Sequence, residues 1–393
     1  MSEDNQIGEE GVKGLGTALV SCSNLSTIIL GLSQNKINSQ NVSDLCSTLS
    51  KCNNLKRLTL ELGKNQLGDF DLQGLDTLLE SCDKLQSFIF DLEQNSIGKD
   101  GIIALANRFT SDIKFSYLDL NLSSNNIGIE GISYLGSALS NCKNLSSLKL
   151  KLFFSKINDE DIIGFAQNFA KCLSLSSLDI YLDHNLIKDQ GALTLCSAIS
   201  NFKSLSDLTI TFMSNQIKGE NAKELGQALS NCCKLQNLTI MLCRNEIGDL
   251  GVSDLSSGLS NCLSLINLNL NFDENEIGNN GSLDLCSGLA NCVNLTDLTL
   301  SFENNQIIDE DVNKIGLFLL NCVKLQNLTL WIDCNQISDQ GALNLCNAIA
   351  KCTNLQNAML QMNYNEIDEE IYQNLMKKLI KAKRLVNVLL SCF

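Results

Sequence analysis

Proline is missing altogether from the 393 residues, and the chain holds only one tryptophan and one histidine, His184. Because proline interrupts helices and sheet ladders, its absence suits a chain that is almost entirely regular secondary structure. A single histidine and the lack of any CxxC pair argue against a zinc site. The sequence therefore predicts neither a metal nor a cofactor.

Long hydrophobic runs are also missing. Apolar positions are too interleaved to give the 18 consecutive residues of a membrane-spanning helix, and residues 1–21 lack the apolar core of a signal peptide. The net charge of −15 argues against nucleic acid or an anionic membrane as a partner. We expect a cytoplasmic protein, with the cytoskeleton or a cilium as the alternative location.

The chain does contain a repeat of 30 residues that runs from its first residues to its last. In the copy over 235–262, Leu238, Ile240 and Leu242 alternate with polar neighbours, which predicts a strand with one buried face. Val252, Leu255 and Leu259 then follow at spacings of three and four, which predicts a helix with one apolar side.

An asparagine follows each predicted strand. Its side-chain amide both donates and accepts, so stacked copies can satisfy the backbone groups that a sharp inward turn leaves without ladder partners. We therefore interpret the column as a buried structural ladder, with Ser155 as its only break. The column comprises Asn5, Asn35, Asn65, Asn95, Asn125, Asn185, Asn215, Asn245, Asn275, Asn305, Asn335 and Asn365.

Most of the 18 cysteines also fall in columns. Packed helices lie about 8–10 Å apart, beyond the roughly 7 Å that a disulfide bridges. We therefore expect buried thiols in a reducing compartment. One column, at the helix end, comprises Cys22, Cys52, Cys82, Cys142, Cys172, Cys232, Cys262, Cys292, Cys322 and Cys352, and a second column comprises Cys46, Cys196, Cys286 and Cys346.

Parallel stacking of strand, turn and helix predicts an α/β solenoid. Strands lie about 4.8 Å apart and helices about 8–10 Å. The stack should therefore curve into a right-handed horseshoe, with the parallel sheet on the concave face and the helices on the convex face. No linker interrupts the register, so we expect residues 1–393 to form a single domain of about 13 repeats.

The pattern LxxLxLxLxxNxIxxxGxxxLxxxLxxCxxL resembles the leucine-rich repeats of the ribonuclease-inhibitor type, over the whole chain. The strand motif is two residues longer than the usual one, which predicts longer strands and a taller concave wall. The resemblance implies an interaction protein. Members of that class include inhibitors, immune sensors, activators of a nuclear-transport GTPase, actin-capping proteins and axonemal components, and fold alone does not choose among them.

Function should lie in the outward strand positions, because these vary while the core columns do not. An outward aromatic side chain has no core to join, and exposed aromatics with arginine are typical of interface hot spots. We expect a protein partner to contact Lys149, Lys151, Phe153, Asp179, Tyr181, Asp183, Met213, Met241, Arg244, Asp273, Glu303, Trp331 and Asp333.

Two details of this surface are open to test. Lys149 and Asp179 should face each other across adjacent strands as an exposed ion pair. Phe153 should point outward beside Tyr181 and Met213. The alternative is that the neighbouring Phe154 fills space at the irregular turn where Ser155 replaces asparagine.

The sequence thus favours a non-enzymatic scaffold that binds a protein on its concave face. One alternative is an architectural subunit of a cytoskeletal or axonemal assembly, with end-to-end contact through the strand at 385–390. A further alternative is a regulator similar to the nuclear-transport GTPase activators, although their acidic C-terminal tail is missing. His184, Asp183 and Cys243 are the candidates for catalysis, but Cys243 should lie roughly 10 Å from His184, too far for a dyad.

Overall fold

The computed structural model describes residues 5, 7–22, 24–72, 74–109, 114–219, 222–382 and 384–392. These residues form 13 parallel strands that alternate with α-helices along the chain. The fold is an α/β repeat solenoid, as the sequence predicts. It divides into two compact units, Met1–Leu186 and Ile187–Phe393. Each unit is considered by itself, and a single continuous domain stays a prediction.

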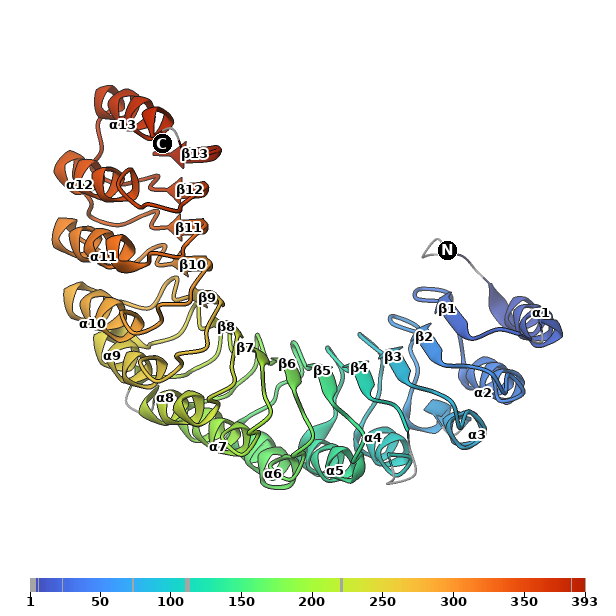
Figure 1. Cartoon of the computed structure of the whole chain (residues 1–393). Helices are drawn as coiled ribbons and strands as arrows, with labels where there is room; N and C mark the ends of the chain where they lie inside the picture. Colours follow the sequence, from blue (N-terminus) through green and yellow to red (C-terminus); the bar gives the residue numbers. More distant parts are fainter. Residues whose placement is uncertain are drawn as a thin grey trace. The chain divides into compact units, whose positions relative to one another are not determined.

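The first unit contains six strands and the helices that precede them (Figure 1). Its elements are α1 (Gly8–Ser21), β1 (Thr27–Gly31), α2 (Ser39–Leu49), β2 (Arg57–Glu61), the 3₁₀ helix η1 (Asp69–Leu72), α3 (Leu75–Ser81), β3 (Ser87–Asp91), α4 (Lys99–Ala106), β4 (Tyr117–Asn121), α5 (Gly128–Asn141), β5 (Ser147–Lys151), α6 (Asp159–Phe169) and β6 (Ser177–Tyr181).

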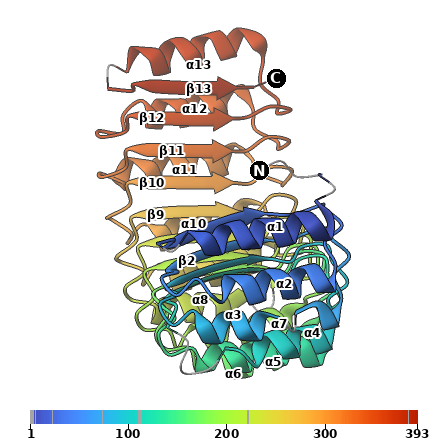
Figure 2. The same cartoon turned by 90° about the vertical axis from the view of Figure 1, so that its right-hand side faces the viewer.

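The second unit contains seven strands, of which β10 to β13 are seen side on in Figure 2. Its elements are α7 (Asp189–Ile199), β7 (Asp207–Thr211), α8 (Ala222–Asn231), β8 (Asn237–Met241), α9 (Gly248–Leu259), β9 (Asn267–Asn271), α10 (Asn279–Leu289), β10 (Asp297–Ser301), α11 (Asp309–Asn321), β11 (Asn327–Trp331), α12 (Asp339–Ile349), β12 (Asn357–Gln361), α13 (Glu369–Lys381) and β13 (Asn387–Ser391).

Within each unit the strands pair in chain order, and each residue pairs with the residue 30 positions later. The second and fourth residues of a strand, such as Leu298 and Leu300, are buried against the helices. The first, third and fifth residues point to the uncovered side of the sheet, which we call the open face. Burial of one leucine or isoleucine contributes about 1.5–3 kcal/mol, so the repeated core columns hold each unit together.

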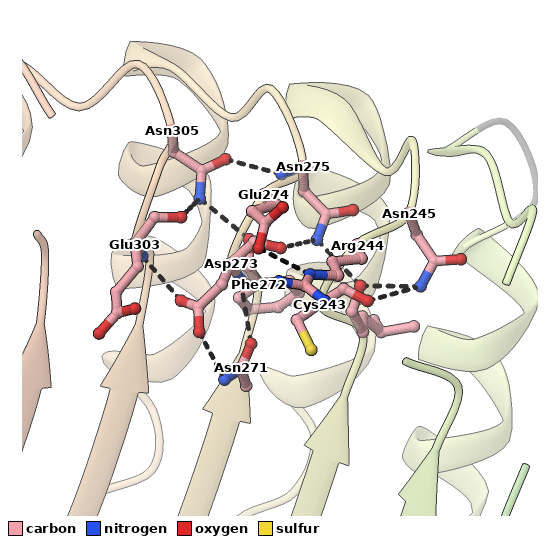
Figure 3. Close-up of polar contacts among 11 residues, drawn as sticks. Cys243, Arg244, Asn245, Asn271, Phe272, Asp273, Glu274, Asn275, Glu303 and Asn305 are labelled. Carbon is pink, nitrogen blue, oxygen red and sulfur yellow. Dashed lines mark hydrogen bonds and ion pairs between the residues drawn. The ribbon is translucent and has the colours of Figure 1, made fainter. Parts of the chain in front are cut away.

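The asparagine column forms the predicted ladder (Figure 3). Asn275, which is fully buried, shows the pattern. Its Nδ2 donates to the carbonyl oxygens of Leu242 and Asp273, both at 2.9 Å, and its Oδ1 accepts from the N–H of Ile247 at 3.2 Å. One side chain thereby satisfies backbone groups of two successive repeats, which is the role that the sequence predicts.

Ser155 interrupts the ladder in the first unit. Its backbone N–H still donates to Asn185 Oδ1 at 3.0 Å, while its hydroxyl reaches only the carbonyl oxygen of Phe153, at 3.1 Å. A serine is too short to span back to the preceding repeat. The ladder is therefore broken directly beside Phe153 and Phe154.

The residue before each ladder position adopts a left-handed backbone, with φ of 51° at Phe154, 56° at His184 and 56° at Arg244. Glycine or asparagine favours this conformation, yet the column holds no glycine and only one asparagine, Asn304, so the conformation could not be predicted from the sequence. Backbone bonds across repeats hold the turn: Arg244 N–H donates to the carbonyl oxygen of Asp273 at 2.9 Å.

Cysteines in the two columns are buried in the described repeats, apart from Cys22. The thiol of Cys262 donates to the carbonyl oxygen of Leu229 in the preceding repeat, at 3.5 Å. Burial raises the pKa of this thiol to about 12. Cys22 was expected in the core but is exposed, because in the described structure α1 packs against α2 alone.

Candidate functional site

Aromatic and charged side chains meet on the open face of β5 and β6 in the first unit. The two strands are parallel neighbours, with Lys149 opposite Asp179 and Lys151 opposite Tyr181. All four residues occupy third or fifth strand positions and are half-buried. The register therefore assembles the charged part of the predicted site.

Phe153 and Phe154 continue the strand β5 into its turn. The Phe153 ring lies 5.6 Å from the Tyr181 ring, centroid to centroid, in a tilted arrangement. Phe154 is 59% exposed and stacks on His184, with centroids 4.3 Å apart and planes 6° from parallel. We call Lys149, Phe153, Phe154, Tyr181 and His184 the aromatic patch.

The exposure of Phe154 decides between the two interpretations of the double phenylalanine. Phe153 is half-buried beside Tyr181, as the binding hypothesis requires. The alternative, in which Phe154 fills internal space, is wrong, because the residue is exposed and its ring stacks on His184 rather than in the core. The left-handed backbone at Phe154 turns its side chain outward.

The expected ion pair between Lys149 and Asp179 is not formed among the described residues. The Lys149 ammonium lies instead over the Tyr181 ring, 5.3 Å from its centroid, in a cation–π contact. Lys151 forms an ion pair with Asp119 on β4, with its Nζ 3.4 Å from Asp119 Oδ1. A long lysine side chain reaches a diagonal neighbour as easily as a facing one, so register alone did not determine the pairing.

The phenol of Tyr181 is held in its neutral form. Desolvation by burial, followed by the nearby Asp179 and Asp119, raises its pKa to about 12. Desolvation and Asp119 also raise the pKa of Tyr117 on β4. At neutral pH both hydroxyl groups therefore remain hydrogen-bond donors, which adds polar recognition to an otherwise apolar surface.

Asp183 does not belong to this surface. The sequence places it among the partner-binding residues, but its side chain is only 7% exposed. Asp183 lies past the end of β6, where the chain turns inward, and its carbonyl oxygen accepts hydrogen bonds from Phe154 N–H and Asn185 Nδ2. Strict alternation fails at this position because the strand has ended.

The remaining predicted residues lie in the second unit. Met213, Met241 and Trp331 are half-buried near the open face or the turn that follows it, whereas Arg244 is exposed and pairs with Glu274, with Nε 2.8 Å from Oε1. The hydrogen bond to Glu274 raises the pKa of Arg244. Cys243, named above as a candidate for catalysis, is buried, again because it follows the strand.

Asp273, Glu303 and Asp333 form an acidic row in this unit. Asp273 accepts hydrogen bonds from Ser301 Oγ at 2.5 Å, Glu303 N–H at 2.7 Å and Asn271 Nδ2 at 2.7 Å. Asp333 accepts from the Asn363 N–H at 2.5 Å. Desolvation raises the pKa of Asp273, and desolvation followed by Asp273 and Asp333 raises that of Glu303. The aspartates mainly satisfy the protein's own turns.

A second set of asparagines, which was not predicted from the sequence, lies on the open face of this unit. Asn327 Nδ2 donates to Asp297 at 2.5 Å, Asn357 Nδ2 to Asn327 at 2.5 Å, and Asn387 Nδ2 to Asn357 at 2.7 Å. The signal was present in the sequence as a run of Asn and Asp at the first strand position. These side chains satisfy one another in a row along the sheet.

The catalytic candidates do not assemble a dyad in the described first unit. His184 stacks on Phe154, and the Asp183 side chain is buried in the turn. No group of three or more His, Cys, Asp or Glu is placed to hold a metal among the described residues. Within the same part of the chain, no helix is long and apolar enough to cross a membrane.

Comparison with known proteins identifies the fold. No family model and no curated protein sequence matches the chain. The structure is similar to that of an internalin from Listeria monocytogenes, with a TM-score of 0.55 and 20% identity, over 99% of this chain and 89% of that one. It has the fold of a leucine-rich-repeat protein. A leucine-rich-repeat protein from Leptospira interrogans gives a TM-score of 0.44 and 18% identity, over 94% and 97%.

The leucine-rich-repeat fold agrees with the resemblance seen in the sequence. The ribonuclease-inhibitor subtype stays a prediction, and so does the end-to-end contact through β13, where Val386 and Leu389 are exposed.

Proposed function

We propose that this leucine-rich-repeat protein is a non-enzymatic scaffold that binds a protein partner through the aromatic patch of its first unit. The observation that carries the proposal is Phe154, a 59% exposed ring held outward by a left-handed backbone and stacked on His184. A ring in this position contributes nothing to the core, and aromatic side chains on rigid elements are typical binding anchors.

The charge balance of the patch indicates the chemistry of the partner segment. Lys151 is paired with Asp119, and Lys149 lies over a neutral Tyr181 ring. The patch therefore offers ring faces and phenol donors rather than a field of one sign. A partner that presents an apolar or aromatic side chain next to hydrogen-bond acceptors fits this surface.

The seven predicted residues of the second unit play a smaller part in the proposal. Arg244 and the carboxylates Asp273 and Asp333 already have partners inside the protein. Desolvating such groups to meet a second partner costs free energy. The location in the cytoplasm and the absence of enzymatic activity remain parts of the proposal.

Affinity capture from the native source tests this function. The full chain should recover a protein that the Phe153→Ala/Tyr181→Ala variant fails to recover at the same loading. Ile29→Ala is the matched control, because Ile29 is a 69% exposed apolar residue on the open face of the same unit. Equal recovery by the wild type and the double variant would contradict the proposal.

A further inference from the structure

The two edges of the sheet in the second unit carry opposite charge. Parallel strands place all turns that lead into β7–β13 at one edge, seen at the left of β10–β13 in Figure 2. We call this the basic edge: residues 201–206, 231–236, 261–266, 291–296, 321–326, 351–356, 381–382 and 384–386. Its described residues include no Asp or Glu, and its cations are Lys203, Lys234, Lys324, Lys351, Lys381 and Arg384.

The acids at the opposite edge have structural roles. Asp249 Oδ1 accepts from Gly278 N–H at 2.7 Å, Asp309 Oδ1 from Ser338 N–H at 2.8 Å, and Asp339 Oδ1 from Asp368 N–H at 2.8 Å. Each aspartate near a helix N-terminus thus also ties down the next repeat, and its charge is favourable there. The structure of the repeat therefore accounts for these three carboxylates.

The cations of the basic edge are not explained in the same way. Helices α7 to α12 have no basic residue in their last turn, so the four lysines that follow these helices lie beyond the reach usually ascribed to the helix dipole. Lys381, by contrast, lies in the last turn of α13. Lys203 does bond a helix-end carbonyl, at 2.9 Å, and Lys324 bonds Asn294 at 2.7 Å. None of the six cations forms an ion pair within the described structure. The five lysines are exposed, whereas Arg384 is half-buried and donates to the carbonyl oxygen of Ala350.

Three aliphatic side chains project from adjacent turns between these lysines. Leu263, Val293 and Val323 are 57%, 53% and 54% exposed. The same column holds Lys203 and Thr353 in other repeats, so the core does not require an apolar residue there. Asn294 Nδ2 donates to the carbonyl oxygen of Leu263 at 3.0 Å, and Asn354 Nδ2 likewise to that of Val323. These bonds join each turn to the turn of the next repeat and leave the aliphatic side chains exposed.

We propose that the basic edge of the second unit is a contact surface for an anionic lipid bilayer. Aliphatic tips that enter the interfacial region, flanked by lysines that face anionic headgroups, are the two signals that peripheral membrane binding combines. This use of the chain lies outside the proposed binding of a protein by the first unit.

The net charge of −15 argues against an anionic membrane as a partner. A net charge, however, does not reveal that the two edges of the second unit differ in the sign of their charge. A strand of five residues spans about 17 Å, and the turns add to it, whereas surface charges are screened beyond about 8–10 Å in physiological salt. The acidic edge therefore acts only weakly on a surface in contact with the basic edge.

Other anionic partners fit this edge less well. Single-stranded nucleic acid is bound by aromatic side chains that stack on bases, whereas the sole aromatic residue of the described basic edge, Phe202, is fully buried. Acidic peptide motifs are recognised by arginine clusters, whereas five of the six cations here are lysines. The nearest carboxylates, Asp207 and Asp297, open strands and accept bonds from Asn237 and Asn327.

Vesicle co-sedimentation of the full chain tests the proposal. Vesicles of phosphatidylcholine with about one-third phosphatidylserine should bind the protein in ~0.1 M salt, and pure phosphatidylcholine vesicles should not. Replacement of Leu263, Val293 and Val323 together by serine should weaken binding about tenfold. Leu250→Ser is the matched control, since Leu250 is 60% exposed at the acidic edge of the same unit.

Charge variants test the contribution of the lysines separately from that of the aliphatic side chains. Lys234→Gln/Lys351→Gln should weaken binding and reduce its salt dependence, whereas Lys218→Gln, at the acidic edge beside Glu246, should not. Failure of the wild type to sediment with the anionic vesicles would overturn the proposal. So would equal losses in the control variants, or binding to a polyanion such as heparin without binding to vesicles.

Discussion

The open faces of the two units are built on the same backbone but use their side chains differently. At β5 and β6 the Phe153 ring lies against the half-buried Tyr181 ring, and the exposed Phe154 stacks on His184. On β10–β13 the side chains of Asp297, Asn327 and Asn357 hydrogen-bond to one another in a row. A face whose polar groups are already satisfied gains little from a partner, whereas exposed rings gain by being buried.

The buried asparagine ladder also differs between the two units. In the second unit it runs through Asn245, Asn275, Asn305 and Asn335, and each of these asparagines bonds to the repeat before it. In the first unit Ser155 breaks it directly beside the aromatic patch. The aromatic patch, the proposed binding surface, thus lies where the repeat lacks part of its own stabilisation, which is typical of functional sites.

The largest expected effect on stability is loss of an intact ladder position. Asn275→Ala should lower the free energy of unfolding by about 1–3 kcal/mol, because it leaves the N–H of Ile247 buried without a partner and removes one of the two donors to each of the carbonyl oxygens of Leu242 and Asp273. Urea unfolding measures it. Asn261→Ala, at an exposed position, should stay within about 0.5 kcal/mol, and similar losses in both variants would refute the ladder.

Repair of the break should have a smaller effect of opposite sign. Ser155→Asn should raise the free energy of unfolding by about 1 kcal/mol, because its amide can reach Asn125, Ile127 and Leu122 as Asn185 reaches Ser155, Ile157 and Leu152. The melting temperature measures it. A lower melting temperature would show that the patch leaves no room for asparagine and that the break is required by packing.

The smallest effect concerns the acidic row of the second unit. Desolvation, Asp273 and Asp333 raise the pKa of Glu303 above its usual 4.5. A carboxyl group whose pKa is raised in the folded state contributes most to stability at a pH below its unfolded-state pKa. It loses that contribution as the pH rises through its folded-state pKa. Glu303→Gln should therefore stabilise by a few tenths of a kcal/mol at pH 7, after allowance for solvent screening.

Unfolding of the Glu303→Gln variant across the pH range supplies the control. The difference from the wild type should vanish below the usual pKa of glutamate, where both side chains are neutral. A variant that is less stable at pH 7 would show that the charged carboxylate is favourable where it stands.

The fold could be predicted because the same pattern recurs in every repeat. The alternation of Leu238, Ile240 and Leu242 and the asparagine column each have one physical explanation, and the structure confirms both. The site was predicted only where strand alternation still holds, as for Lys149, Lys151 and Tyr181. Past the strand ends the rule fails, and Asp183 and Cys243 are buried.

Other features needed side-chain geometry that no spacing supplies. Lys151 reaches Asp119 across a diagonal, and Lys149 lies over the Tyr181 ring. The left-handed turn at Phe154 contains no glycine that would have indicated it in the sequence. The charge of the two edges was readable from the sequence, because the predicted parallel sheet places each column at one edge, but the net charge of −15 concealed it.

The most direct test of the central claim is the affinity of the captured partner for variants of the two open faces. Phe153→Ala/Tyr181→Ala in the first unit should raise the Kd at least about tenfold with an unchanged melting temperature, because an interface anchor of this kind contributes about 2 kcal/mol. Asn327→Ala/Thr329→Ala in the second unit should leave the Kd within about twofold. Equal Kd values for the two variants, or a greater loss in the second unit, would contradict the account.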